Sequence, residues 1–199
     1  MVEPRDALLS MLREHAFKQG DFTLKSGKKS DFLIDCKNVV LSARGHHLVG
    51  EVLLTSLQTF GCTAVAGVEL GGCPLASAVA SASARTLKHI DAIYVRKEAK
   101  AHGSKSLLEG AGLLARSSRV VVVEDVTTTG GSALAATVHL WKYGFDVVGV
   151  CSLVDRLEGG REAIEKEKLR FWSVFDRHDF IVKEPHGREE LAPGADEEP

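Results

Sequence analysis

The chain lacks the long apolar runs and the cysteine patterns that mark membrane and secreted proteins. No hydrophobic stretch approaches the roughly 20 residues that a membrane-spanning helix needs, and Met1–Asp6 contains no apolar core of a signal peptide. The four cysteines form no Cys-x-x-Cys pair, and neither they nor the histidines have metal-ligand spacing. We therefore expect a cytoplasmic protein with reduced thiols, no membrane partner and no dedicated metal site.

A strongly basic surface is also missing. The 199 residues carry a formal net charge of −2. Segment 184–199 holds six acids and one base, which leaves 21 acids and 24 bases in the rest of the chain. This mildly basic body suits a small polyanionic ligand and argues against a nucleic-acid partner, which requires a clustered positive face. The acidic segment 185–199, which contains proline and glycine, is expected to be disordered.

Apolar periodicity along the chain alternates between helix and strand patterns. The predicted helices are 6–18, 42–60, one from Pro74 onward, 132–143 and 161–168, and the predicted strands are 22–26, 31–35, 63–68, 92–96, 119–124, 147–154 and 171–175. Strands joined by helical crossovers imply an α/β fold with a parallel sheet flanked by helices. We expect one domain over 1–184, in which the first helix and a hairpin (about 1–40) form a small cap on the core (about 42–175).

The most informative segment of the chain runs from Val120 to Ser132. Its four consecutive valines, Val120–Val123, indicate a strand that is buried on both faces of a parallel sheet. Glu124 and Asp125 come where the strand ends, followed by the loop Val126–Ser132 and a helix. Glycines in such a loop let the backbone approach a ligand, and a helix start attracts an anion. The segment fits a sugar-phosphate site whose carboxylates hold ribose hydroxyls or a divalent cation. The plain alternative is an ordinary strand-to-helix turn.

A long polar loop continues from a predicted strand as far as Gly112. Its first part carries Arg96, Lys97, Lys100 and His102, with no recurring apolar face. One interpretation is a solvated charge run. The other is a lid that brings several donors to a pyrophosphate, because the loop is long and follows the carboxyl end of a strand, where open α/β sheets bind ligands.

Three further features have both a functional and a plain structural interpretation. Arg156 follows the predicted strand 147–154, and it is suited either to grip a planar carboxylate or to form a surface salt bridge. Lys25 stands at the start of the hairpin turn and is equally consistent with a solvated turn lysine. The turn Glu69–Gly72 either presents backbone N–H groups to pyrophosphate oxygens or needs its glycines only for their dihedral angles.

Taken in this order, these features resemble the type I phosphoribosyltransferases, and among them the orotate phosphoribosyltransferases. The resemblance covers roughly residues 6–175 and is most specific at Leu24–Gly27, Arg96–Gly103 and Glu124–Ser132. It implies transfer of the phosphoribosyl group of phosphoribosyl pyrophosphate (PRPP) to orotate, giving orotidine 5′-monophosphate and pyrophosphate in pyrimidine biosynthesis. It also implies Mg²⁺ as cofactor and a homodimer in which the basic loop reaches into the neighbouring subunit's site.

The same resemblance implies roles for individual residues. PRPP would be bound by Lys25, Arg96, Lys97, Lys100, His102, Glu124, Asp125, Val126, Thr127, Thr128, Thr129, Gly130, Gly131 and Ser132. The catalytic candidates among them are Lys100, His102, Glu124 and Asp125. Orotate would contact Thr128, Arg156 and the backbone near Leu33 and Ile34. PRPP itself would hold most of the Mg²⁺ coordination, with Glu124 and Asp125 as the candidate protein ligands.

The chain departs from the family pattern at two places. Many relatives carry a lysine in the turn where this chain has Glu69–Gly72, so one pyrophosphate contact is either missing or supplied by backbone amides. Many relatives also have aspartate where this chain has Glu124.

Three other functions are consistent with parts of the pattern. A purine or xanthine phosphoribosyltransferase would be favoured by an aromatic stacking residue after the last parallel strand, where this chain has Asp155–Leu157. A non-catalytic PRPP-sensing regulator would need a DNA- or partner-binding module and has no use for a basic lid. A response-regulator-like receiver with Asp125 as acceptor would need an acidic cluster before its first helix, which the sequence lacks.

Overall fold

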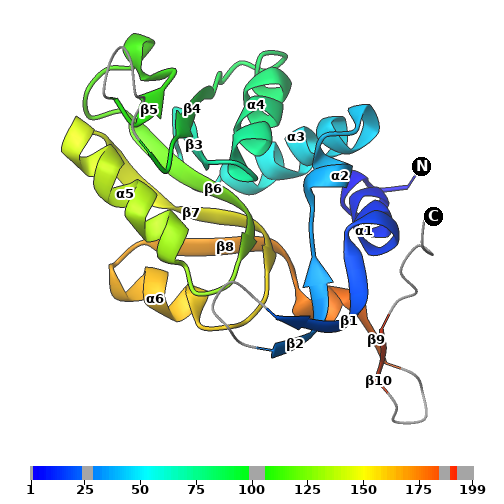
Figure 1. Ribbon diagram of the computed structural model, residues 1–199. Helices are drawn as coiled ribbons and strands as arrows, with labels where there is room; N and C mark the ends of the chain where they lie inside the picture. Colours follow the sequence, from blue (N-terminus) through cyan, green and yellow to red (C-terminus); the bar gives the residue numbers. More distant parts are fainter. Residues whose placement is uncertain (1, 24–28, 99–105, 184–188, 192–199) are drawn as a thin grey trace.

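The computed structural model describes residues 2–23, 29–98, 106–183 and 189–191. Its centre is a six-stranded sheet with the strand order β5-β4-β3-β6-β7-β8 (Figure 1). These strands are β3 (Ala64–Val68), β4 (Asp91–Val95), β5 (Leu108–Glu109), β6 (Arg119–Thr127), β7 (Asp146–Asp155) and β8 (Arg170–Asp176). All neighbours pair in parallel except β5, which runs antiparallel to β4 at the edge.

Helices cover both faces of this sheet (Figure 1). One face carries α1 (Pro4–His15), α3 (Ala43–Leu57) and α4 (Gly72–Ser83), with the short α2 (Lys37–Val40) before α3, and the other face carries α5 (Gly131–Tyr143) and α6 (Gly160–Lys166). Two apolar cores result, one on each side of the sheet. The predicted α/β fold is confirmed, including the helix start at Ser42, whose Oγ accepts a hydrogen bond from the Gly45 N–H at 3.1 Å.

The valine run lies at the centre of the sheet. Val121 and Val123 belong to the core under α3 and α4, whereas Val120 and Val122 belong to the core under α5. All four side chains are completely buried. The sequence prediction of a strand covered on both faces is therefore confirmed, and this rigid strand fixes the position of the acids and the loop after Val123.

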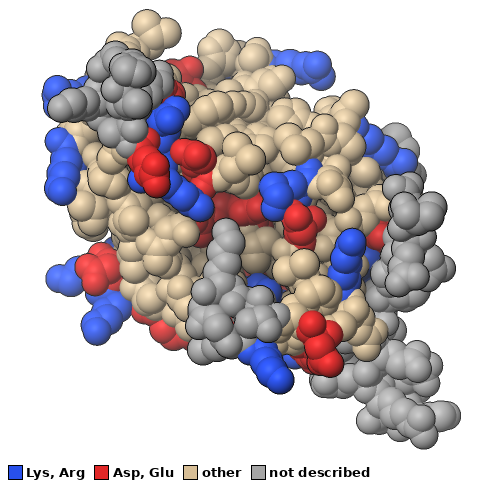
Figure 2. Space-filling model, in the orientation of Figure 1, with Lys and Arg blue, Asp and Glu red and all other residues tan. Residues whose placement is uncertain are grey.

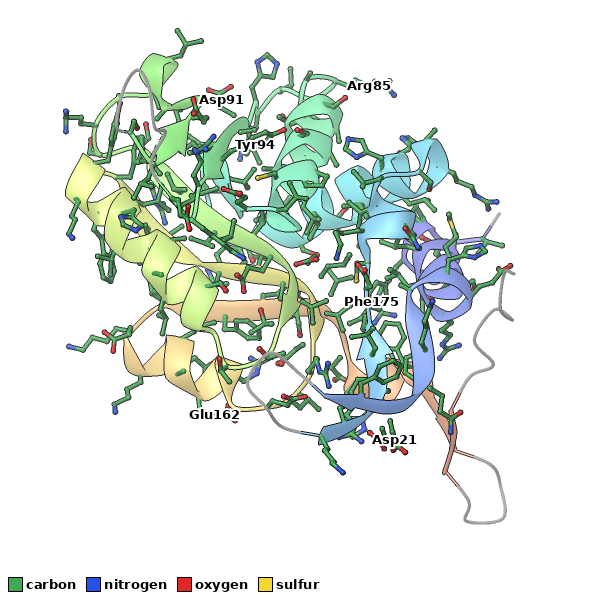
Figure 3. The ribbon with its side chains drawn as sticks, in the orientation of Figure 1. Asp21, Arg85, Asp91, Tyr94, Glu162 and Phe175 are labelled. Atoms are coloured by element: carbon green, nitrogen blue, oxygen red, sulfur yellow. The ribbon has the colours of Figure 1, made fainter. Side chains whose placement is uncertain are left out.

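The N-terminal cap is a hairpin of β1 (Phe17–Thr23) and β2 (Lys29–Ile34). Phe17 stacks on Phe32 and on Phe180, which follows β8 in a 3-10 turn (Arg177–Phe180). Phe175 of β8 points toward the cap, where the Arg5 guanidinium lies 4.7 Å from its ring centre (Figure 3). These aromatic contacts join the cap to the last strand of the sheet.

Several local predictions differ from the structure. The first helix ends at His15 because Phe17 pairs with Ile34 and begins β1, earlier than the predicted strand at 22–26. Strand β5 and a 3-10 turn (Ala111–Leu113) occupy the second half of the predicted loop 96–112. Within the expected disordered tail, Glu189–Leu191 form β10, which pairs with β9 (Ile181–Lys183). None of the helices in the described ranges has the length and apolar character that spanning a membrane demands.

Candidate active site

Glu124 and Asp125 lie near the carboxyl end of β6, at the edge where the parallel strands β3, β4, β6 and β7 end. Strand β6 extends to Thr127, which pairs with Asp155 of β7, so the acids sit inside the strand and not beyond it. A cleft of about 320 Å³ opens above them, which we call the acid cleft. It is lined by Lys37, Val68, Glu69, Leu70, Gly71, Lys97, Glu124, Asp125, Val126 and Ser132. Figure 2 shows acidic side chains in a hollow near the middle of this face, with basic side chains on either side of it.

Burial perturbs both carboxyl groups. The Glu124 side chain is 6% exposed, and this burial, followed by the neighbouring negative charge of Asp125, raises the pKa of Glu124 to about 7. The Thr127 hydroxyl, 3.5 Å from Oε2, and the charge of Lys97 oppose that rise. Burial also raises the pKa of Asp125, against the backbone N–H of Val126 and the positive charge of Lys37. The cleft thus disfavours two negative charges unless a cation or hydroxyl groups satisfy them.

The turn between β3 and α4 packs directly against Asp125. A Cβ atom on Gly71 would lie 2.1 Å from Asp125 Oδ2, and one on Gly72 would lie 2.4 Å from the Val123 carbonyl oxygen. Gly71 has an ordinary φ of −67°. Glycine at this position is therefore favoured by lack of space beside Asp125 and not by its dihedral angles, which corrects the dihedral interpretation of this turn. The Glu69–Leu70 peptide is cis, and the Glu69 carboxylate accepts a hydrogen bond from the Lys97 N–H at 3.2 Å.

The loop after the acids has an inner and an outer part. The Thr127 side chain is fully buried, and its hydroxyl donates a hydrogen bond of 2.9 Å to Ser152 Oγ on β7. The structure turns this side chain inward, although the resemblance groups it with the ligand contacts. Gly130 adopts φ +76° at the N-cap of α5, a conformation that favours glycine. Thr129, Gly131 and Ser132 are exposed, so the outer loop and the first turn of α5 face solvent.

The described part of the basic loop borders the same site. Lys97 lines the acid cleft and, with Arg96, also lines an adjoining cleft of about 330 Å³ beside the first turns of α5. The Arg96 Nε donates to the Glu98 carbonyl oxygen at 3.1 Å. The structure therefore places Lys97 in the cleft of the acid pair and Arg96 in the adjoining cleft. Lys25, Lys100 and His102 lie outside the described residues.

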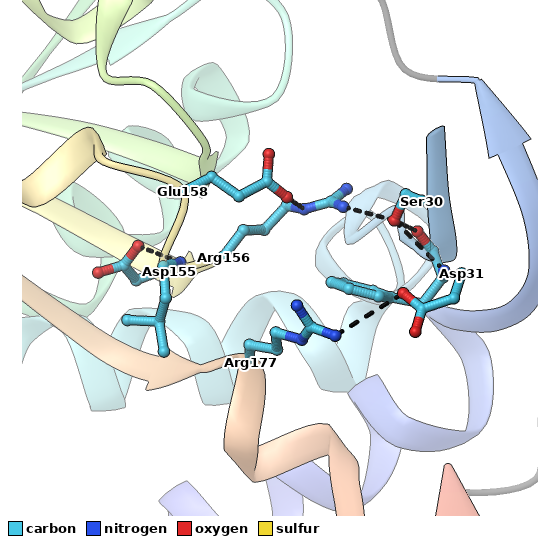
Figure 4. Close-up of polar contacts among 8 residues, drawn as sticks. Ser30, Asp31, Asp155, Arg156, Glu158 and Arg177 are labelled. Atoms are coloured by element: carbon cyan, nitrogen blue, oxygen red, sulfur yellow. Dashed lines mark hydrogen bonds and ion pairs between the residues drawn. The ribbon is translucent and has the colours of Figure 1, made fainter. Parts of the chain in front are cut away.

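Arg156 is buried, whereas the salt-bridge interpretation placed it at the surface (Figure 4). Its side chain is 3% exposed, and its guanidinium lies 4.3 Å from the ring centre of Phe32. Its Nε donates to Glu158 Oε1 at 2.8 Å, and its Nη2 donates to Ser30 Oγ at 3.0 Å. The expected salt bridge exists, but it is buried between the cap and the end of β7. The Asp155 carboxylate, also buried, accepts a hydrogen bond from the Leu157 N–H at 2.9 Å.

The cap hairpin faces a further cleft of about 420 Å³. It is lined by Lys29, Ser30, Asp31, Phe32, Glu158 and Arg177. Arg177 Nη2 lies 3.7 Å from Asp31 Oδ1, and its guanidinium is 4.9 Å from the Phe32 ring centre. Ile34, predicted near the orotate site, has its side chain in the core, whereas Leu33 and Thr128 are half-buried. Sequence reasoning missed Ser30 and Phe32, although both stand in the hairpin segment that it singled out.

Comparison with known proteins identifies the family. A model of the phosphoribosyl transferase domain matches residues 47–185. An orotate phosphoribosyltransferase of Sorangium cellulosum is 50% identical over 184 residues, which cover 92% of this chain and 96% of the relative. This chain belongs to the orotate phosphoribosyltransferase family. A second such enzyme, of Synechocystis, is 45% identical over 175 residues, covering 88% of this chain and 87% of the relative.

Solved structures of this family have the same fold. The orotate phosphoribosyltransferase of Mycobacterium tuberculosis in complex with Fe(III) dicitrate has a TM-score of 0.77 at 38% identity, over 89% of this chain and 98% of that chain. The same enzyme in complex with PRPP has a TM-score of 0.73 at 34% identity, over the same shares. An adenine phosphoribosyltransferase of Leishmania tarentolae, at 17% identity and a TM-score of 0.60, shares the fold alone. A purine enzyme is therefore not favoured, and neither is a non-catalytic regulator.

Proposed function

We propose that this protein transfers the phosphoribosyl group of PRPP to orotate and releases orotidine 5′-monophosphate and pyrophosphate. The observation that carries the proposal is the acid cleft. It places a buried carboxyl pair beside an exposed loop and the first turn of a helix, on a chain that belongs to the orotate phosphoribosyltransferase family. Carboxylates suit a ribose diol, and free N–H groups at a helix start suit a phosphate monoester.

In this proposal the two parts of the loop act differently on PRPP. Glu124 and Asp125 hold the ribose hydroxyls, while the backbone of Val126–Ser132 and the exposed Ser132 and Thr129 side chains hold the 5′-phosphate. Support comes from the burial of Glu124, which disfavours its ionised form unless a donor satisfies it. Thr127 contributes through its backbone, because its side chain is bonded to Ser152.

The residues of the cleft also fit Mg²⁺, which prefers oxygen ligands and few protein contacts. Glu124 and Asp125 are neighbours in the acid cleft, and no group of three or more His, Cys, Asp or Glu suited to a metal occurs in the part of the chain that the structure describes. We propose that these two acids hold the ion together with PRPP oxygens. When bound, Mg²⁺ would offset negative charge on the departing pyrophosphate.

The chain's own residues then have two tasks, to stabilise the leaving pyrophosphate and to keep water from the ribose. Lys97 lines the acid cleft and Arg96 lines the adjoining cleft, and both are proposed as pyrophosphate donors. Lys25, Lys100 and His102 are proposed for the same group. Donors that tighten only as the bond to pyrophosphate breaks would raise turnover, whereas equal binding of both states would only lower KM.

Arg156 is proposed as the group that recognises orotate. Its contacts with Glu158 and Ser30 engage two of the five N–H donors of a guanidinium and hold its plane beside Phe32. A planar, buried guanidinium at the end of a parallel strand suits the carboxylate that distinguishes orotate from uracil. Thr128 and the backbone near Leu33 and Ile34 complete the proposed base site.

One assay separates this function from its rivals. Purified protein with PRPP and Mg²⁺ is offered orotate, uracil, hypoxanthine and xanthine in parallel, and pyrophosphate release is followed. We expect release with orotate alone and none from Asp125→Asn protein. Preference for hypoxanthine or xanthine would assign the base site to a purine, and binding of PRPP without turnover of any base would support a regulator.

We also propose a cytoplasmic homodimer with shared active sites. The four free thiols support a reducing compartment, and the family resemblance supports the dimer. Mixing Lys100→Ala with Asp125→Asn protein should then restore part of the activity, because a hybrid dimer holds one intact site. Mixtures as inactive as their components would mean that each subunit supplies its whole site.

A further inference from the structure

We propose that Lys37 binds the diphosphate of PRPP in the acid cleft. The inference rests on the proposed function and extends it to a residue that neither the sequence patterns nor the family resemblance singled out. Lys37 is the first residue of α2 and closely follows the cap strand β2. It lines the cleft together with Lys97, which reaches the cleft from a different element, the end of β4.

The ligand requires cations that the neighbouring turn does not supply. Three carboxylate residues, Glu69, Glu124 and Asp125, line the acid cleft, whereas PRPP brings several negative charges of its own. The resemblance places a lysine in the turn after β3, but a Cβ on Gly71 would lie 2.1 Å from Asp125 Oδ2. A side chain at Gly71 would require the Asp125 carboxylate to move, and the turn Glu69–Gly72 carries no basic residue. Lys37 of α2 supplies a cation that lines this cleft.

The charge of Lys37 is secured by its neighbours. Lys37 Nζ lies 2.5 Å from Asp35 Oδ1, and this hydrogen bond raises the pKa of the lysine. The negative charge of Asp125 raises it further, and Lys37 in turn opposes the rise in the Asp125 pKa. The ammonium is therefore charged at neutral pH and interacts with the acid that is proposed to hold ribose.

The ion pair with Asp35 leaves the Lys37 ammonium available to a ligand. The two side chains are 45% and 46% exposed, and ion pairs in such positions contribute little to stability. Asp35 Oδ1 also accepts a hydrogen bond of 3.1 Å from the Lys37 backbone N–H, which is independent of the ammonium. The side chain can therefore turn from Asp35 to a phosphate at low cost while the start of α2 stays in place.

Lys37→Met, Lys37→Arg and the control Lys18→Met test this inference. Lys18 lies on β1 of the same cap, is exposed, and also acts electrostatically on Asp35, but it is not among the residues that line the acid cleft. Calorimetry gives the Kd of PRPP and of pyrophosphate with Mg²⁺ present, and steady-state kinetics gives KM for both substrates. We expect Lys37→Met to weaken both calorimetric affinities about tenfold or more, the loss typical of one charge-assisted hydrogen bond, with KM for orotate unchanged. Lys37→Arg should keep most of the affinity, and Lys18→Met should match the wild type.

The possible failures are distinguishable. A PRPP Kd of Lys37→Met protein within twofold of the wild type overturns the inference, and so does a rise in KM for orotate alone, which would place Lys37 at the base. A third contrary result is an equal loss of affinity in Lys37→Arg and Lys37→Met with a lowered melting temperature in both. This result would overturn the inference, because it would mean that Lys37 stabilises the fold and does not bind the ligand. A wild-type protein that binds PRPP but does not convert orotate refutes the proposed function, whereas the calorimetric comparison still decides the role of Lys37.

Discussion

Glu124 should make the stability of the free protein depend on pH in an unusual direction. Burial raises its pKa from 4.5 to about 7, so the folded protein retains a proton that the unfolded chain has already released. Between these two values the folded state binds more protons than the unfolded state, and the free energy of unfolding therefore falls as pH rises. Below pH 4.5 both states are protonated, and above about pH 7 both are ionised, so the effect is confined to that window.

The magnitude is set by the size of the shift. One pKa unit corresponds to about 1.36 kcal/mol, so a rise of this size amounts to about 3 kcal/mol for a side chain that is 6% exposed. Glu124→Gln protein has no charge to desolvate at this position. Relative to the wild type, it should therefore gain about 2.5 kcal/mol in unfolding free energy on going from pH 5 to pH 8, because the unfolded glutamate is already largely ionised at pH 5.

Urea denaturation at pH 5, 6, 7 and 8 without Mg²⁺ measures the difference in unfolding free energy between Glu124→Gln and the wild type. Glu167→Gln is the matched control, because Glu167 is exposed at the end of α6. We expect the control to run parallel to the wild type at every pH. A constant difference between wild type and Glu124→Gln across the range would refute the reasoning, since it would mean that the Glu124 carboxyl ionises equally in both states. PRPP with Mg²⁺ should abolish the pH dependence, because the bound ligand satisfies the ionised form.

Three other substitutions test the rest of the site. Lys100→Ala should lower kcat about a hundredfold or more, the usual cost of one preorganised donor, and a near-normal kcat would remove the lid from the mechanism. Gly71→Ala should lower the free energy of unfolding by about 1–3 kcal/mol and weaken PRPP binding, because its Cβ would meet Asp125. Gly112→Ala is the control, because no atom lies within 4 Å of its Cβ, and it should change neither quantity. Denaturation measures the stability, and calorimetry measures the PRPP affinity. Arg156→Met should raise KM for orotate about tenfold or more and leave KM for PRPP unchanged, and equal changes in both would place Arg156 in the framework.

Sequence reasoning located the sheet well because its strands are unambiguous. A run of four valines such as Val120–Val123 is typical of a parallel-sheet strand buried on both faces, and the helices between strands leave few possible topologies. It failed where contacts between distant residues decide the structure, as in β1, and where a strand is too short to show a pattern, as in β5. Phe17 joins β1 because it stacks between Phe32 and Phe180, residues far away in sequence. Strand β5 has two residues, too few for any periodicity.

In the candidate site, the positions of residues along the sheet could be predicted from the sequence, but their burial could not. Residues at or just beyond the carboxyl ends of strands, such as Asp125 in β6 and Lys97 after β4, reach one edge because these strands are parallel, and their meeting could be predicted. Burial could not be predicted, because the enclosure of Arg156 depends on Phe32 and Ser30 from the cap. A polar side chain at a strand end is equally compatible with a surface pair and with a buried one until the opposite element is placed.

The turn after β3 illustrates a dependence that lies beyond any local pattern. Two glycines let this turn approach β6: a Cβ on Gly72 would lie 2.4 Å from the Val123 carbonyl oxygen, and one on Gly71 would lie 2.1 Å from Asp125 Oδ2. The close approach and the position of the acid are therefore one arrangement, and a side chain at Gly71 can be introduced only if the carboxylate moves. A lysine at Gly71 and the present Asp125 position exclude each other with this backbone. The lysines that line the cleft in the described residues come from α2 and from the end of β4, as Lys37 and Lys97.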